Sequence, residues 1–253
     1  MIDKTFSVDS SPDIEVRVES GRVELRRGRP GTVHVTVDTK NPDFIVEQRG
    51  NSILVSSDKT TPWLSRGSAY VVVETPEGSD LLMAVASAQT QAALSLGKVD
   101  IKTASGDIEV ESAETLNVKT ASGDTRVKRV DRSLRFTSAS GDLVVENTVH
   151  GSISASTASG DIYIDECEGT LDVKTASGDT RVRRFTGRSV YCKGMSGTID
   201  LGIPRRTEVS LDVNLLSGKM KLPEPETGDD EPERRMEIRV KLVSGDLRIE
   251  RAD

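Results

Sequence analysis

Hydrophobic and polar residues alternate along most of the chain with a period of two. Leu116, Val118 and Thr120 share one phase before a turn, Ile108 and Val110 do so after a turn, and the residues between them are mostly charged or small. Such alternation is typical of strands with one buried face, because successive side chains of a strand point to opposite faces. The pattern therefore predicts short strands separated by turns and argues against a helical bundle.

A short motif recurs at nearly regular intervals. Thr-Ala-Ser-Gly-Asp begins at Thr103, Thr120, Thr157 and Thr175, and a Ser-Ala-Ser-Gly-Asp variant begins at Ser138. With three degenerate copies included, the serines stand at positions 105, 122, 140, 159, 177, 196, 217 and 244. A unit of about 18 residues with two short strands cannot bury its apolar face alone, so the copies are expected to stack on one another.

The stacked copies predict an all-β fold, namely a parallel β-solenoid (β-helix) with coils of about 18 residues that covers residues 69–253. Residues 1–68 alternate more loosely and predict an irregular, antiparallel N-terminal β segment that caps the solenoid. Residues 223–233 are acidic and proline-rich and predict a solvated loop. Residues 236–251 return to the repeat pattern, so we expect them to form the final coil.

A glycine follows the serine in every copy of the motif. We expect these glycines to permit the sharp bend between two strands, because glycine lacks a Cβ. They are Gly106, Gly123, Gly141, Gly160, Gly178, Gly197, Gly218 and Gly245. Threonine and serine near the bend are expected to form hydroxyl ladders, in which each hydroxyl bonds its neighbour in the next coil.

An aspartate follows the glycine in the five best copies and forms the most suggestive row for chemistry. Stacked carboxylates about 5 Å apart repel one another unless they are compensated, and oxygen ligands in a row would suit Ca²⁺. The competing interpretation is turn chemistry, in which each carboxylate accepts a backbone N–H. We favour the turn, because the nonapeptide typical of calcium β-rolls is absent, so neither a metal site nor a cofactor is predicted. The row comprises Asp107, Asp124, Asp142, Asp161 and Asp179.

The composition disfavours catalysis. A serine nucleophile needs a histidine, and His150 is the only histidine inside the repeats. A carbohydrate-active enzyme would need paired acids in a groove with aromatic platforms, whereas aromatic residues make up 3% of the chain. Cys167 and Cys192 lack metal-ligand spacing. We expect Cys192 to be buried at an inward phase and Cys167, in an acidic connection, to be exposed.

The charges restrict the partners. A net charge of -7 with interspersed signs disfavours nucleic acid. Basic residues 119–129 recur as residues 174–184, each after an acidic coil, so oppositely charged outer rows are expected to pair. No run of about 18 apolar residues predicts an integral membrane segment. The start of the chain shows no export signal, so we expect a cytoplasmic protein that reaches the membrane or envelope through a partner.

The phased Ser-Gly-Asp motifs and their flanking alternation resemble the bacterial DUF4097 family of adhesin-like, β-strand repeat proteins. The resemblance implies a β-solenoid and, in some members, a link to the cell envelope or its stress responses. It implies no catalytic residues. We therefore expect a non-catalytic scaffold, a rigid rod that binds a protein partner or itself. A module that binds glycans or anionic surfaces and a divergent carbohydrate-active β-helix enzyme are the alternatives.

Overall fold

The computed structural model describes residues 1–57, 68–223 and 232–252. These residues form 20 strands and no helix. By its contacts the chain separates into two compact units, Met1–Arg126 and Val127–Asp253. The expected boundary between residues 68 and 69 stays a prediction, and most of the acidic loop 223–233 lies outside the described residues.

The first unit combines parallel and antiparallel ladders. One edge of β2 pairs in parallel with β5 and β6, and its other edge pairs in parallel with β7. β7 also pairs in parallel with β8. The ladders β1–β3, β3–β6 and β4–β5 are antiparallel. Its strands are β1 (Ile2–Ser7), β2 (Asp13–Arg27), β3 (Thr32–Thr39), β4 (Ile45–Arg49), β5 (Ser52–Ser56), β6 (Ser68–Thr75), β7 (Asp80–Lys102) and β8 (Ile108–Lys119).

The expectation of an antiparallel N-terminal segment is right for β1, β3 and β4 and wrong for β2. β2 pairs with β7 in parallel over almost its whole length, from Asp13 to Arg26. Its apolar residues Ile14, Val16 and Val23 are fully buried. A strand that is covered on both edges by parallel neighbours has its inward side chains sealed above and below. β2 is therefore part of a parallel stack.

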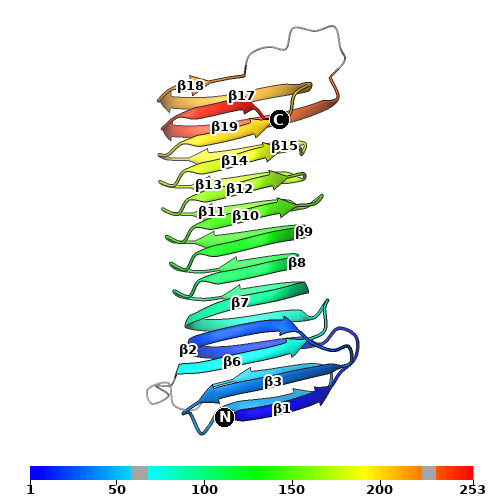
Figure 1. Cartoon of the computed structure of the whole chain (residues 1–253). Helices are drawn as coiled ribbons and strands as arrows, with labels where there is room; N and C mark the ends of the chain where they lie inside the picture. The colour runs from blue at the N-terminus through cyan, green and yellow to red at the C-terminus, as the bar shows by residue number, and fades with distance from the viewer. Residues whose placement is uncertain (58–67, 224–231, 253) are drawn as a thin grey trace. The chain divides into compact units, whose positions relative to one another are not determined.

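The second unit is a stack of coils in which each coil contributes one strand to each of two faces, except that the long first strand, β9, pairs with both β10 and β11. β9, β11, β13, β15, β19 and β17 form one face, and β10, β12, β14, β16, β20 and β18 form the other, all in parallel register (Figure 1). These strands are β9 (Thr125–Ser138), β10 (Leu143–Thr148), β11 (Ser152–Thr157), β12 (Ile162–Cys167), β13 (Thr170–Thr175), β14 (Thr180–Phe185), β15 (Ser189–Gly194), β16 (Ile199–Ile203), β17 (Thr207–Ser217), β18 (Met220–Lys221), β19 (Arg234–Ser244) and β20 (Leu247–Arg251).

The interior of the second unit is a set of apolar columns. Val173 pairs in register with Cys192, and Cys192 pairs with Val240, all three buried. The expectation that Cys192 is buried is confirmed. The expectation that Cys167 is exposed is wrong, because β12 extends through Cys167 and places it inward, opposite Thr148 and Phe185.

The coils of the second unit do not stack in sequence order at the C-terminal end. β19 pairs with β15 on one edge and with β17 on the other, and β20 lies in the same way between β16 and β18. In Figure 1, β19 lies between β17 and the yellow coils. The expectation that residues 236–251 form the final coil is therefore wrong, because residues 207–221 form the outermost one.

Candidate functional site

The glycine column is held by close backbone contact between coils. A Cβ on Gly178 would lie 2.0 Å from the carbonyl oxygen of Gly160, and one on Gly123 would lie 2.2 Å from that of Gly106. Neither Gly123 nor Gly178 has a positive φ, whereas the degenerate copies Gly197, Gly218 and Gly245 combine the close approach with φ values of 124°, 136° and 141°. In the best copies the glycine is thus required by packing between coils rather than by the bend itself.

The aspartate row is bonded by backbone amides. Oδ1 of Asp142 accepts the N–H of Asp161 at 2.8 Å, and Oδ1 of Asp161 accepts that of Asp179 at 2.8 Å. In the first unit, Oδ1 of Asp107 accepts the N–H of Asp124 at 3.1 Å. Each of these carboxylates accepts a backbone N–H of the next coil and not one of its own turn, so it links two coils. Among the described residues, no group of three or more His, Cys, Asp or Glu side chains is placed to hold a metal ion.

The hydroxyl rows also differ from the expected ladders. Oγ1 of Thr175 accepts the N–H of Gly178 at 2.8 Å within its own turn, and Thr120 does the same for Gly123. The serine hydroxyls donate to carbonyl oxygens one coil earlier, as Ser177 does to Ala158 at 3.4 Å. The threonines therefore close the turns, and the serines link successive coils. The carboxylate of Glu168 lies 3.4 Å from Nδ1 of His150.

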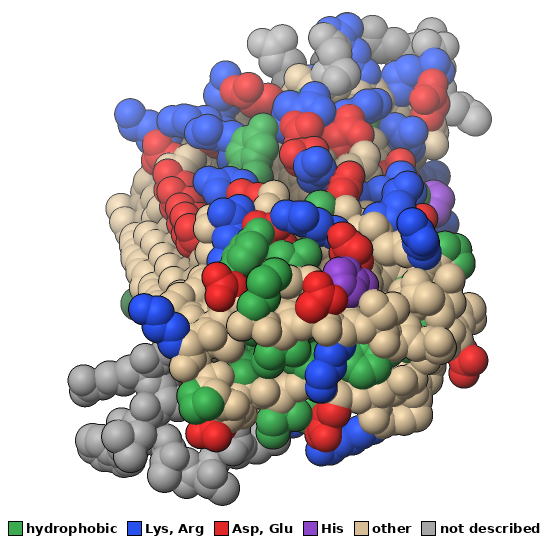
Figure 2. Space-filling view, turned by 60° about the horizontal axis from the view of Figure 1, so that its bottom comes forward, with side chains coloured by type: hydrophobic (Ala, Val, Ile, Leu, Met, Phe, Trp, Pro, Cys, Tyr) green, Lys and Arg blue, Asp and Glu red, His purple; other side chains and the backbone are tan. Residues whose placement is uncertain are grey.

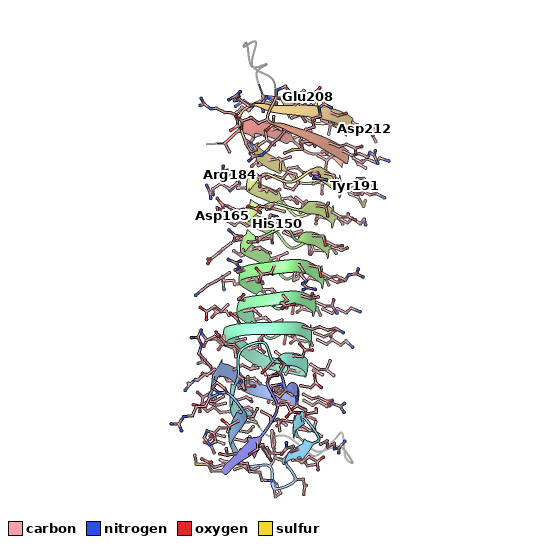
Figure 3. The ribbon with its side chains drawn as sticks, turned by 90° about the vertical axis from the view of Figure 1, so that its right-hand side faces the viewer. His150, Asp165, Arg184, Tyr191, Glu208 and Asp212 are labelled. Atoms are coloured by element: carbon pink, nitrogen blue, oxygen red, sulfur yellow. The ribbon has the colours of Figure 1, made fainter. Side chains whose placement is uncertain are left out.

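The outer charges of the second unit pair between coils as expected. Arg183 binds Asp165 and Glu166, and Arg181 lies 3.2 Å from Asp200. The bond to Asp165 raises the pKa of the Arg183 guanidinium, which stays charged. Figure 2 shows basic and acidic side chains interspersed over much of the visible face. Figure 3 places Asp165 and Arg184 on one face of the second unit and Tyr191 and Asp212 on the opposite face.

A shallow pocket of about 300 Å³ opens beside these ion pairs. Its polar lining comprises Arg181, Arg183, Asp200, Arg248, Glu250 and Arg251. Asp200 faces both Arg181 and Arg248, and the Arg251 guanidinium donates to the carbonyl oxygens of Pro204 and Thr207. The arginines are thus directed to partners within the chain, so the pocket offers an anion little positive charge that is not already neutralised.

The outermost coil has one open side. β17 pairs with β19 and with no other described strand, and β18 pairs with β20 alone. The inward residues Val209, Leu211, Val213 and Leu215 are therefore sealed on one side only, and Leu211 is 38% exposed. The inward residues opposite them on β19 are buried. An edge strand with this exposure is a template for pairing with another strand.

Exposed hydrophobic side chains gather in the last three coils of this stack. Leu216 near the end of β17, Val243 near the end of β19 and Met195 just after β15 stand at the phase that carries alanine in the best motif copies. Leu216 is 76% exposed, and Met220 on the other face is 52% exposed. The six exposed large side chains of this group are Met195, Leu211, Leu216, Met220, Leu222 and Val243. The repeat pattern alone does not predict this surface, but the change from alanine to larger residues at this phase is a sequence signal for it.

One glutamate and one aspartate on β17 form ion pairs with arginines of the neighbouring strand β19. Glu208 lies 2.9 Å from Arg235, and Asp212 lies 3.2 Å from Arg239, both arginines being on β19. Figure 3 shows Glu208 and Asp212 on the outermost strand. The open coil therefore presents an apolar inward row and an outward row whose charges are already compensated.

Three solved structures from Parabacteroides species are similar to the chain. A putative lipid binding protein from Parabacteroides distasonis has the same fold, with 15% identity and a TM-score of 0.53 over 97% of this chain and 96% of that chain. Putative adhesins from Parabacteroides distasonis and Parabacteroides merdae, each 12% identical, match at TM-scores of 0.42 and 0.43. They cover 99% and 100% of this chain and 96% of each of theirs.

No curated protein matches the chain. Among the described residues there is no helix that is long and apolar enough to cross a membrane. The family model described as Toastrack DUF4097 matches residues 12–250. The phased glycines, the parallel coils and this match over nearly the whole length lead to one assignment: the chain belongs to the Toastrack DUF4097 family.

Proposed function

We propose that the protein is a non-catalytic interaction module that binds a protein partner by adding a strand to the open edge of β17. The observation that carries this proposal is the outermost coil, whose backbone edge has no described partner and whose inward row is partly exposed. A strand placed there gains main-chain hydrogen bonds and covers apolar side chains at the same time.

The repeating coil supports a scaffold role. In the coils from β9 to β16, paired residues of successive coils are 18 or 19 positions apart, as in Ser152–Thr170 and Leu143–Ile162, and we infer a repeat of about 18 residues from them. Such a stack is rigid because each coil is bonded to its neighbours along both faces. A rigid stack with one open end favours binding at that end. The cytoplasmic location expected from the sequence stays a prediction.

The alternatives are less well supported. An adhesin-like or lipid-binding role would agree with what the structural neighbours are said to be, but the arginines of the pocket beside Asp200 are bonded within the chain. An enzyme would require an activated nucleophile or a pair of acids in a groove. The serine row instead donates to backbone carbonyls. We therefore favour strand addition over surface binding and over catalysis.

Site-specific photo-crosslinking tests the proposal. Lys174, Lys193, Lys241 and Asn214 occupy one register column, in which Lys174 is on a strand paired on both edges and Asn214 is on β17. A benzophenone amino acid is placed at position 214 or, as the matched control, at position 174, in cells that produce the protein naturally. We expect a covalent adduct of defined mass from position 214 and none from position 174. Equal yields at the two positions, or no adduct at position 214, would contradict the proposal.

A further inference from the structure

We propose that the strand added to β17 is β17 of a second copy of this chain, paired antiparallel about a two-fold axis centred on Leu211. The inference rests on the function proposed above, because it names the occupant of the same edge. It makes the protein a dimer in which the open ends of two second units seal each other.

The geometry of the edge favours an antiparallel pair. A two-fold axis along the strand direction would pair the two edges in parallel but place the two inward rows on opposite sides of the sheet. A two-fold axis at right angles to the sheet pairs them antiparallel and keeps both rows on the same side. Only this arrangement continues the apolar columns of both copies into each other and covers Leu211 and its neighbours.

The inward row is self-complementary about Leu211. In this register, Leu211 faces Leu211 of the second copy, and Val209 faces Val213 in both directions. Leu211 is exposed, whereas Val209 and Val213 are half-buried. The register thus brings the most exposed inward side chain against its own copy at the centre of the junction, where exclusion of water is most complete. Nine residues of β17, positions 207–215, would take part.

The outward charges disfavour the registers centred on Ser210 and on Asp212. A register centred on Ser210 brings Glu208 opposite Asp212, and one centred on Asp212 brings two copies of Asp212 together. Like charges directly opposite each other destabilise a strand pair. In the register centred on Leu211, Asp212 faces Ser210 and Glu208 faces Asn214. A register centred on Val213 also avoids facing carboxylates, but it displaces the most exposed inward residue from the axis and puts Leu216 opposite Ser210.

The lateral ion pairs are compatible with this junction. Arg235 and Arg239 already hold Glu208 and Asp212 from β19, on the side away from the free edge. No charged group of β17 therefore has to be stripped of its partner when the second copy binds. The junction consists of backbone hydrogen bonds, an apolar centre and neutral outward contacts.

Sedimentation of the purified chain tests the inference directly. We expect the wild-type protein to shift from monomer to dimer between about 1 and about 200 µM. Leu211→Glu places two carboxylates at the centre of the junction, so it should remain monomeric throughout. Leu216→Glu is the matched control, because Leu216 lies beyond the nine paired residues, and it should dimerise like the wild type. A wild-type chain that stays monomeric, or equal loss in both variants, would overturn the inference.

Ser210 tests the register. Ser210→Glu puts a carboxylate opposite Asp212 twice in each dimer, so we expect the dissociation constant to rise roughly tenfold. Ser210→Lys places an opposite charge there and should keep or tighten the dimer. Ser210 also lies beside Glu237 of its own chain, so the melting temperature of each dilute monomer is measured as the control for folding. Equal dissociation constants for the two variants would exclude the register centred on Leu211.

The two proposals fail in different ways. A benzophenone adduct at position 214 with twice the mass of the chain supports both. An adduct with a different protein, together with a wild-type chain that remains monomeric, overturns the self-pairing and leaves strand addition standing. The absence of any adduct at position 214, from a chain that is monomeric at every concentration, overturns both.

Discussion

The backbone N–H of Asp179 donates a hydrogen bond of 2.8 Å to the carboxylate of Asp161, one coil earlier. Asp179 in turn accepts the N–H of Thr198 at 2.7 Å, so the row passes from coil to coil through amides and carboxylates. Hydrogen bonds to an ionised acceptor are stronger than neutral ones. The row therefore fixes the register of the stack. Its carboxylates accept backbone hydrogen bonds without a cation.

Removal of the Asp161 carboxylate should weaken the stack. We expect Asp161→Ala to lower the free energy of unfolding by about 1–2 kcal/mol, because the N–H of Asp179 loses its acceptor at a partly solvated site. Asp161→Asn keeps an oxygen and should cost less. Urea unfolding measures both variants. Equal losses would contradict this account, and so would a wild-type melting temperature that differs between calcium and a chelator.

Alanine at Gly178 should be poorly tolerated. Its Cβ would lie 2.0 Å from the carbonyl oxygen of Gly160, which can move only if the two coils separate. Overpacking against backbone destabilises by about 1–3 kcal/mol or more, so we expect a loss at or above the top of that range. Ser177→Ala, which removes a long hydroxyl bond, is the control and should cost under about 1 kcal/mol. Thermal unfolding followed by circular dichroism distinguishes them.

Neither cysteine should react while the protein is folded. Burial raises the pKa of the Cys192 thiol to about 12 and also raises the pKa of Cys167. At pH 8 both are therefore protonated as well as inaccessible, and the thiolate is the reactive form. We expect a colorimetric disulfide reagent to detect no thiol in the native protein and two after denaturation. Rapid reaction of one thiol in the native state would show that Cys167 lies outside the core.

His34 should make the first unit more stable in mild acid. Its hydrogen bond to Asp3 at 2.9 Å, with a second contact to Glu74, raises its pKa above 6.5. A raised pKa gives a stabilisation that is complete below the unfolded value and is lost as the pH rises through the folded value. We expect the free energy of unfolding of the wild type to exceed that of His34→Gln by under about 1 kcal/mol at pH 5.5, because the site is partly exposed, and by less at pH 8.5.

Denaturant titrations at the two pH values check this expectation. Asp3→Asn removes the principal partner of His34 and should reduce the pH dependence without changing the histidine itself. A difference in the free energy of unfolding between wild type and His34→Gln that increases towards pH 8.5 would contradict a raised pKa of His34.

Period-two alternation and phased glycines were enough to predict the all-β fold and its parallel stacking. Residues such as Leu171 and Val173 carry that information locally, because each must be inward for the strand to have a dry face. The position of Cys167 was missed because its acidic neighbours resemble a loop, whereas β12 continues through it. Local composition cannot show where a strand ends when its last inward position is filled by a small residue.

The order of the last coils could not be read from the spacing of the motifs. Intervals count residues along the chain, but the choice between β17 and β19 as neighbour of β15 depends on which side chains fit. Gly194 leaves room for Leu242, whose Cδ2 would lie 2.7 Å from a Cβ at that position. Such a fit between distant residues appears only in three dimensions, and the open edge of β17 follows from it.

The insertion of residues 234–251 between two earlier coils has a consequence for synthesis on the ribosome. The preceding coils can be laid down one after another as the chain emerges, but β17 leaves the exit tunnel before the strand that separates it from β15. Until the last residues are translated, β17 is free to occupy the place of β19. A chain that ends before β19 would therefore tend to form a stack with one coil fewer, in which β17 takes the place of β19 beside β15.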